Sequence, residues 1–332
     1  MGHKFRELRP TRRGVAVAAI AGLAFLAGAT TGARSLNAVV VPALVAVAAG
    51  AVQLSRADPP TVERSVPEPG FPGERRTVAV TVESAVPCRV RDAVGDGLTT
   101  GADPAVSVGH GGSFEYEVGL QRRGDHRLGP ATCRLTDSLG LFAVEVEVEA
   151  TATTLVYPNV YEVDGGELSA LVRRVRGDER RSFDRLREFT RGDTMRDIHW
   201  RASAKRGSEE FVVAEYDSDA VVDAVTVVGE AESDGVDAMA STVASVVAFL
   251  NDAGIPVTVV APGGRCVAHP GETTAMLRLL ALTGAGSVDA DGRSGAEVRV
   301  VGDDDRARLS LSDRELSFDG VAGKRRGREV VA

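Results

Sequence analysis

The hydrophobic pattern along the chain changes character twice. Two nearly continuous apolar runs come first, at residues 14–33 and 38–54, each close to the length that a helix needs to cross a bilayer. Residues 75–156 then alternate apolar and polar positions, which predicts half-buried antiparallel strands. From residue 157 onward, short β-branched runs alternate with segments of helical spacing. The chain is therefore predicted to combine a membrane segment with two kinds of domain.

Residues 1–57 are predicted to be a basic N-terminus followed by a hairpin of two transmembrane helices. The turn between the apolar runs carries only Arg34, whereas five basic residues precede the first run: Lys4, Arg6, Arg9, Arg12 and Arg13. This asymmetry places both termini and the soluble domains on the cytoplasmic side of the cell membrane. A cleaved secretory signal also begins with basic residues and an apolar run. The second run, which follows after only a few residues, favours the hairpin.

A Pro-rich segment separates the hairpin from the alternating strands. Residues 58–74 contain five prolines and are predicted to be a stiff linker. The strands of residues 75–156, broken by glycine-rich turns, predict an all-β sandwich domain. A spacing or docking role is expected for this domain rather than chemistry.

Residues 157–320 are predicted to form an α/β domain. Apolar strands at 221–228, 256–260 and 297–301 alternate with helices at 167–176, 236–253 and 272–282. Such alternation predicts a parallel sheet covered on both faces. The remaining residues, 321–332, are a basic tail that is expected to be disordered.

Residues 185–217 mix charged and apolar side chains around Trp200, the chain's only tryptophan. The local pattern predicts an extended segment at 185–189, a helix between Thr194 and Gly207, and a strand at 211–216. Two interpretations remain open. One is an ion-pair network that fixes one element against another. The other is a recognition surface for a partner protein, because arginine and tryptophan often anchor interfaces.

This segment resembles the signature of a bacterial and archaeal family, the domain of unknown function 58 proteins. The matching positions are Arg187-Glu188-Phe189, Gly192-Asp193, Arg196, Ile198, Trp200, Ala202, Ala204-Lys205 and Glu215. Residues 122–142 also resemble that family's R-R-G, L-G-P and D-P-F-G-L-F elements, with Ser138-Leu139 in place of Pro-Phe. The departures are Phe189 for tyrosine, His199 where an acid is commoner, and Lys205 for arginine.

The resemblance implies a C-terminal domain similar to the von Willebrand factor A fold and a MoxR-type AAA+ ATPase as partner. We therefore expect a membrane-anchored, non-catalytic adaptor that serves the assembly or maturation of a protein complex. The residues expected to bind the partner, or to hold the signature together, are Arg187, Glu188, Gly192, Asp193, Arg196, Asp197, His199, Trp200, Arg201, Lys205 and Glu215. The alternative is an enzyme that uses Asp193, Asp197 and His199 as an acid/base set.

Composition narrows the classes of partner and ligand. The 332 residues carry a formal net charge of -8, and only three of the 39 basic residues are lysine. An acidic, lysine-poor surface suits a salt-rich cytosol, as in a halophilic archaeon, although a high-GC genome also depletes lysine. Nucleic acid is not an expected partner, because binding phosphates needs a net basic footprint. The lipid bilayer is an expected partner, and the oligomeric state is left open.

No cofactor, catalytic residue or metal site is predicted. The three cysteines, Cys88, Cys133 and Cys266, are widely spaced and form no C-x-x-C pair, so they are expected to be reduced thiols. The place where a von Willebrand A fold carries its Mg²⁺ ligands offers only Glu230, Ser233 and Asp234. These three are expected to be part of an acidic loop, with weak cation binding as the alternative.

Overall fold

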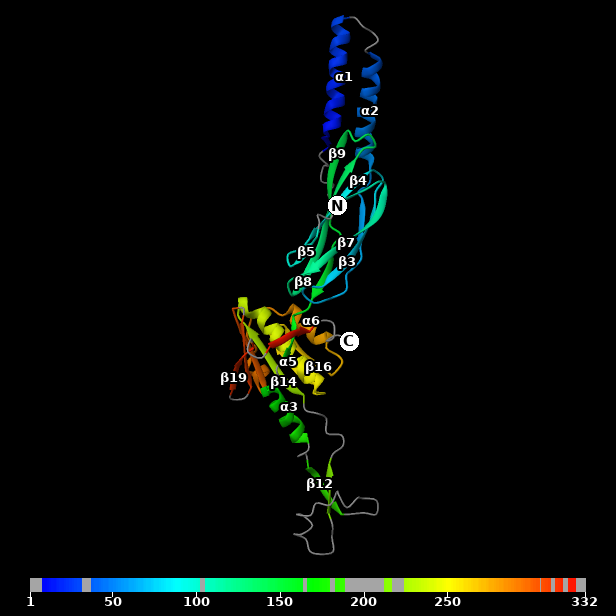
Figure 1. The fold of residues 1–332 in the computed structure, drawn as a ribbon. Helices are drawn as coiled ribbons and strands as arrows, with labels where there is room; N and C mark the ends of the chain where they lie inside the picture. The colour runs from blue at the N-terminus through cyan, green and yellow to red at the C-terminus, as the bar shows by residue number, and fades with distance from the viewer. Residues whose placement is uncertain are drawn as a thin grey trace. The chain divides into compact units, whose positions relative to one another are not determined.

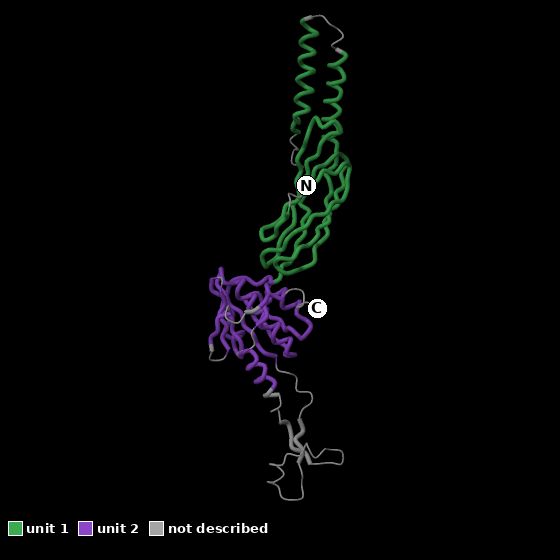
Figure 2. Tube along the Cα trace, in the orientation of Figure 1, with its two compact units in different colours: residues 1–157 green, residues 158–332 purple. Residues whose placement is uncertain are grey.

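The computed structural model describes residues 8–31, 37–101, 105–163, 166–179, 183–188, 212–216, 224–304, 306–311, 314–318 and 322–326. The chain forms two compact units, Met1–Tyr157 and Pro158–Ala332 (Figure 2). The N-terminal helices and a β-rich domain belong to the first unit. A sheet with accompanying helices makes up the second.

The two expected N-terminal helices are present. Helix α1 (Arg12–Thr31) packs against α2 (Asn37–Arg56), as Figure 1 shows. A third candidate span, Ser233–Asp252, consists of a short 3-10 turn followed by helix α5 (Val236–Asp252). However, 67% of its apolar window is buried inside the protein, against 11% for α1 and 17% for α2. The exposed apolar surface that lipid requires is therefore found on α1 and α2.

The β-rich part of the first unit contains two antiparallel sheets. The strand order is β1-β9-β8-β4-β6, with β10 beside β8, in one sheet and β2-β3-β7-β5 in the other. The bounds are β1 Arg9–Pro10, β2 Thr61–Arg64, β3 Arg75–Glu83, β4 Cys88–Val94, β5 Leu98–Thr100, β6 Ala105–Val108, β7 Gly111–Leu120, β8 Gly124–Thr136, β9 Phe142–Val148 and β10 Ala152–Val156. The predicted alternation is confirmed on β3, where Val78, Val80 and Val82 are buried.

The core of this domain also takes in the end of the second helix. Leu54 of α2 is only 1% exposed and belongs to the same apolar cluster as the valines of β3. Cys88 and Cys133 lie in that cluster as free thiols. Helix α2 is therefore embedded in the domain at its C-terminal end.

The Pro-rich segment 58–74 is part of the sandwich, which corrects the predicted linker. Within it, β2 pairs with β3, and Gly70 forms an isolated bridge with Val156. Phe71 is 2% exposed, with its ring centroid 5.4 Å from that of Tyr157. The prolines flank these contacts and do not interrupt them, so the segment is held by pairing at both ends.

A buried polar cluster ties β2 to the rest of the sandwich. Nε of Arg64 donates to Asp92, 2.9 Å from Oδ2, and the hydroxyl of Tyr116 donates to the same oxygen at 2.6 Å. The side chains of Arg64 and Asp92 are 2% and 0% exposed. Burial, followed by the hydrogen bond to Asp92, raises the pKa of Tyr116. Each charge is therefore desolvated and compensated by its partners.

The second unit is built on a six-stranded mixed sheet in the order β16-β15-β14-β17-β18-β19. The bounds are β14 Val225–Ala231, β15 Val257–Ala261, β16 Gly264–Ala268, β17 Val298–Asp303, β18 Arg306–Leu311 and β19 Arg314–Ser317. Strand β14 is parallel to β15 and β17, whereas the three outer strands run antiparallel to their neighbours. The predicted parallel sheet is therefore correct only at its centre. The antiparallel strands β16 and β18 each follow their neighbour in the sheet through a tight turn. The turn after β17 contains Asp304, which has φ 50°.

The two faces of this sheet are covered differently. Helix α5 packs on the face that carries Gly229, where a Cβ would meet Met239 and Val243. Helix α6 (Thr274–Leu282) packs against α5 and β16. On the opposite face, Val228 and Val260 contact Val288, which lies just before the short helix α7 (Ala290–Arg293). Within the described residues, fewer apolar side chains pack on this face than the predicted layer of helices would supply.

The remaining strands of the second unit form two separate pairs. Strand β11 (Val160–Val163) pairs with β20 (Ala322–Arg326), so this part of the basic tail, expected to be disordered, is a strand. Arg326 anchors it with Nη1 2.6 Å from Oδ2 of Asp252. The predicted helix that follows β11 is confirmed as α3 (Gly166–Glu179).

Candidate functional site

The ends of the family-like signature are brought together on a hairpin. Strand β12 (Phe183–Glu188) pairs antiparallel with β13 (Val212–Tyr216), which confirms the extended segments predicted there. In this register Arg187 lies opposite Val213, and Glu215 lies opposite Arg185. Glu188 is paired with Val212, so positions 24 apart in the sequence lie side by side.

Most of the predicted site residues lie outside the described part of the chain. Of the predicted set, Arg187, Glu188 and Glu215 fall on β12 and β13. The predicted helix between Thr194 and Gly207 lies outside the described residues, as do Gly192, Asp193, Arg196, Asp197, His199, Trp200, Arg201 and Lys205. Both interpretations of the signature, structural network and recognition surface, therefore stay predictions.

A cleft of about 770 Å³ opens at the carboxyl ends of β14 and β17. The chain goes from β14 to β15 on one side and later crosses to β17 on the other, so the cleft lies at a topological switch point. Ligands of α/β proteins commonly bind at such points. The lining residues are Glu230, Ala231, Glu232, Ser233, Asp234, Ala285, Gly286, Ser287, Arg293, Arg299, Val301, Asp303 and Asp304.

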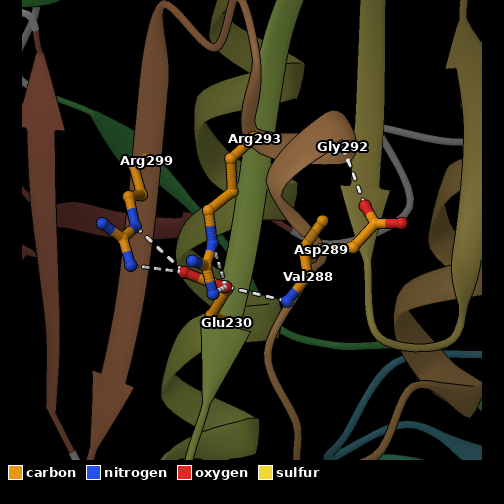
Figure 3. Close-up of polar contacts among 6 residues, drawn as sticks. All are labelled: Glu230, Val288, Asp289, Gly292, Arg293 and Arg299. Carbon is orange, nitrogen blue, oxygen red and sulfur yellow. Dashed lines mark hydrogen bonds and ion pairs between the residues drawn. The ribbon is translucent and has the colours of Figure 1, made fainter.

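Glu230 lies in the wall of the cleft and is held from three directions (Figure 3). Its Oε1 accepts hydrogen bonds from the backbone N–H of Val288 at 2.7 Å and from Nε of Arg293 at 2.8 Å. Its Oε2 accepts from Nε of Arg299 at 2.9 Å and from Nη2 of Arg299 at 2.6 Å. The side chain of Glu230 is 6% exposed, so both oxygens are satisfied inside the protein rather than by water.

These contacts set the charge of the carboxyl group. Burial by itself raises the pKa of Glu230, but the Val288 N–H and the two guanidinium groups outweigh it, so the pKa lies below the ordinary value of 4.5. Glu230 is therefore ionised at neutral pH. It acts as a fixed anion that orients two arginines.

Sequence-based reasoning placed Glu230 with Ser233 and Asp234 in an acidic loop that could bind a cation weakly. In the structure Glu230 belongs to strand β14, whereas Ser233 and Asp234 lie in the short 3-10 helix η2 (Ser233–Gly235). The carboxylate oxygens that a metal ion would need are bonded to arginine and backbone. Across the described ranges, no group of three or more metal-ligating side chains comes together.

The two arginines are the residues of the cleft that sequence-based reasoning missed. Their side chains are 40% exposed for Arg293 and 48% exposed for Arg299, so each guanidinium meets both Glu230 and solvent. Carboxylates also line the opening, at Glu232, Asp234, Asp303 and Asp304. A cleft with fixed guanidinium groups and a carboxylate rim can recognise a polar, charged surface through paired hydrogen bonds.

The segment that supplies Arg293 has its own local support. Asp289 caps α7, with Oδ1 accepting from the backbone N–H of Gly292 at 2.8 Å (Figure 3). Gly292 also allows a close approach, because a Cβ there would meet Val288. The cap and the glycine together hold Arg293 beside Glu230.

No protein-family model matches the chain, and no curated protein matches it. Among solved structures, a C. elegans member of the MSP family is similar over 29% of this chain and 94% of its own, at 8% identity and a TM-score of 0.21. The CARDB domain of the Pyrococcus furiosus protein PF1109 is similar over 28% of this chain and 88% of its own, at 18% identity and a TM-score of 0.20. These likenesses are too weak to carry an argument.

Proposed function

We propose that the chain is a membrane-anchored, non-catalytic adaptor whose second unit faces the cytoplasm. Its partner is a MoxR-type AAA+ ATPase, and its task is the assembly or maturation of a protein complex. The partner comes from the resemblance of residues 185–217 to the domain of unknown function 58 family. The von Willebrand A-like assignment of the second unit belongs to the same proposal, supported by the parallel centre β15-β14-β17 with α5 after β14.

The observation that carries the non-catalytic part of the proposal is that both carboxylate oxygens of Glu230 accept hydrogen bonds. This carboxylate is the buried acid of the cleft at the switch point, and its hydrogen bonds to Val288, Arg293 and Arg299 use both of its oxygens. A general base needs a free lone pair within reach of a substrate proton. Glu230 instead keeps two guanidinium groups in place, which supports a binding role for the cleft.

The membrane topology belongs to the proposal as well. The candidate spans Arg12–Thr30 and Ala38–Arg56 put Arg12 and Arg13 at the start of one helix and Arg56 at the end of the other. In a hairpin these ends lie on the same side of the bilayer, and arginine marks the cytoplasmic side. A reporter fused after Asp58 tests the topology. A cytoplasmic signal is expected, and an external signal would overturn it.

Partner binding is tested by pull-down of the full-length protein from native membranes at high salt. We expect Trp200→Ala and Arg196→Ala each to reduce recovery of the ATPase at least tenfold, without lowering the amount of folded protein in the membrane. Arg308→Ala is the matched control, because Arg308 forms an exposed pair with Asp303, with an N–O distance of 3.5 Å. Undiminished ATPase recovery with both variants would show that the signature is structural.

The same purified protein tests the enzymatic alternative. A pull-down that depends on Trp200, with no turnover that depends on Asp193, Asp197 or His199, is the expected result. Turnover of a small substrate that is lost on Asp193→Asn would replace the adaptor with an enzyme.

A further inference from the structure

The connection between β8 and β9 is bonded to both membrane helices. The backbone N–H of Thr11, directly before α1, donates to the carbonyl oxygen of Leu141 at 2.8 Å, and its hydroxyl donates to that of Gly140 at 2.5 Å. On α2, Nε2 of Gln53 donates to Oγ of Ser138 at 2.9 Å, and the N–H of Ser138 donates to Oε1 of Gln53 at 3.1 Å. The loop therefore meets the start of one span and the end of the other.

Two glycines let the loop approach the helices closely. No Cβ fits at Gly14 of α1, because the carbonyl oxygen of Leu141 occupies its place. A Cβ at Gly50 of α2 would lie 3.0 Å from Oδ2 of Asp137. At 1.5 Å per residue, Gly50 lies about 9 Å along the helix from Arg56, where the candidate span ends. Both glycines therefore place the loop beside the ends of the two candidate spans, where the helix pair meets the membrane surface.

Hydrogen bonds within the loop hold its backbone in place. Asp137 is 2% exposed, and its oxygens accept from the backbone N–H of Leu139 at 3.0 Å and of Phe142 at 2.6 Å. Gly140 has φ +69°, a conformation that favours glycine. The buried carboxylate thus fixes the backbone of Leu139, whose side chain is 55% exposed.

Arginines occupy the same end of the helix pair. Arg12 and Arg13 begin α1 and Arg56 ends α2, and all three are exposed. Guanidinium groups at a membrane surface attract anionic lipid headgroups, at about 1 kcal/mol for each residue. An exposed leucine, in a loop that is bonded to the same helix ends that carry these arginines, matches the pattern of a shallow membrane contact.

We propose that residues 137–142 form a membrane-seated foot of the sandwich. Leu139 inserts among the lipids at the boundary of headgroups and acyl chains, and Arg12, Arg13 and Arg56 bind anionic headgroups around it. The foot joins the soluble domain to the bilayer independently of any ATPase. The sandwich is thereby fixed to the membrane surface through three chain segments.

The insertion of Leu139 is tested with the full-length protein in phosphatidylglycerol nanodiscs, in a Cys266→Ser background. An environment-sensitive fluorophore is attached at Leu139→Cys or at Val66→Cys, a matched control in which Val66 is 69% exposed in another loop of the sandwich. Lipids with a nitroxide near the headgroup should quench the probe at position 139 at least threefold more than the probe at 66. Equal quenching at both positions, with both proteins folded by circular dichroism, would overturn the insertion.

The headgroup contact has its own test by native mass spectrometry of the full-length protein. Combined Arg12→Gln, Arg13→Gln and Arg56→Gln substitutions should reduce phosphatidylglycerol adducts at least fivefold relative to wild type. The control is Arg75→Gln, because the Arg75 side chain is 77% exposed on strand β3. Unchanged adducts in the triple variant, or an equal loss in the control, would overturn the headgroup contact.

Discussion

Arg299 on β17 reaches Glu230 on the parallel neighbour β14, with Nη2 of the arginine 2.6 Å from Oε2 of the carboxylate. The two residues are diagonal in the sheet, since Arg299 lies opposite Val228 and Glu230 opposite Val301. The pair therefore links the strands on either side of the switch point by side chains as well as by backbone. Because both residues line the cleft, a change in the packing of β14 against β17 would also change the shape of the cleft.

Substitution Glu230→Gln should loosen the cleft locally. The amide group keeps an acceptor for Val288 but sets N–H donors against an arginine, so we expect a loss of about 2 kcal/mol. Hydrogen exchange of the full-length protein in nanodiscs should then be about thirtyfold faster in peptides covering β14 and β17. Arg308→Gln should change exchange little, because its partner Asp303 is 58% exposed. Unchanged exchange in Glu230→Gln would contradict the role of the pair.

The same carboxylate predicts a pH dependence. The pKa of Glu230 is lowered from its ordinary value of 4.5, so its stabilisation is complete above pH 4.5 and is lost as the pH falls toward and through the folded-state pKa. The difference in exchange between wild type and Glu230→Gln should therefore shrink below pH 4.5. Comparing the two proteins cancels the titration of other carboxyl groups. A difference that grows on acidification would reverse the assigned sign.

In the sandwich, Asp92→Ala should be among the most damaging substitutions. It leaves the guanidinium of Arg64, which is 2% exposed, buried without its carboxylate, at a cost of about 3–5 kcal/mol. Removing the partner of an exposed arginine provides the control: Glu117→Ala breaks a pair whose side chains are 77% and 64% exposed, and should cost less than about 1 kcal/mol. Urea unfolding followed by circular dichroism measures both. Similar losses for the two variants would argue against the buried pair.

Two glycines of α1 make a matched comparison of the contact between helix and loop. Gly14→Ala places a Cβ against the carbonyl oxygen of Leu141, whereas Gly22→Ala has nothing within 4 Å. Overpacking at position 14 should cost about 1–3 kcal/mol and displace the loop at residues 137–142. Limited proteolysis at this loop should accelerate for Gly14→Ala alone. Equal cleavage of both variants would mean that α1 does not contact the loop closely at Gly14.

Long apolar segments were the most predictable part of the fold. The expected helix at 236–253 is α5, at Val236–Asp252, and the expected span at 38–54 lies inside α2. Such segments bury or expose one kind of side chain over many turns, so the periodic signal accumulates. Strand β2 is too short for that, and prolines flank it. Its place in the sandwich depends on pairing with β3, a contact that the local sequence does not contain.

The charged cleft was only partly predictable. The sequence indicates Glu230 as a candidate, because this carboxylate follows an apolar run. Its partners Arg293 and Arg299, however, lie in a distant part of the chain. The sequence does contain a signal for the ion pair at Arg299, because this residue interrupts the apolar run of β17 between the buried Val298 and Val300. A charge on the alternate face of a buried strand needs a partner on that face. The identity of that partner required the order of the strands.

The pairing of β11 with β20 sets a limit on when the second unit can mature. Val160 of β11 lies opposite Arg326 of β20, so the pair joins segments at opposite ends of the second unit's sequence. Contacts between such distant segments form slowly, because the chain between them must first be closed into a loop. Until β20 has been synthesised, β11 lacks the strand with which it pairs, and an unpaired strand edge is a site at which other chains can associate.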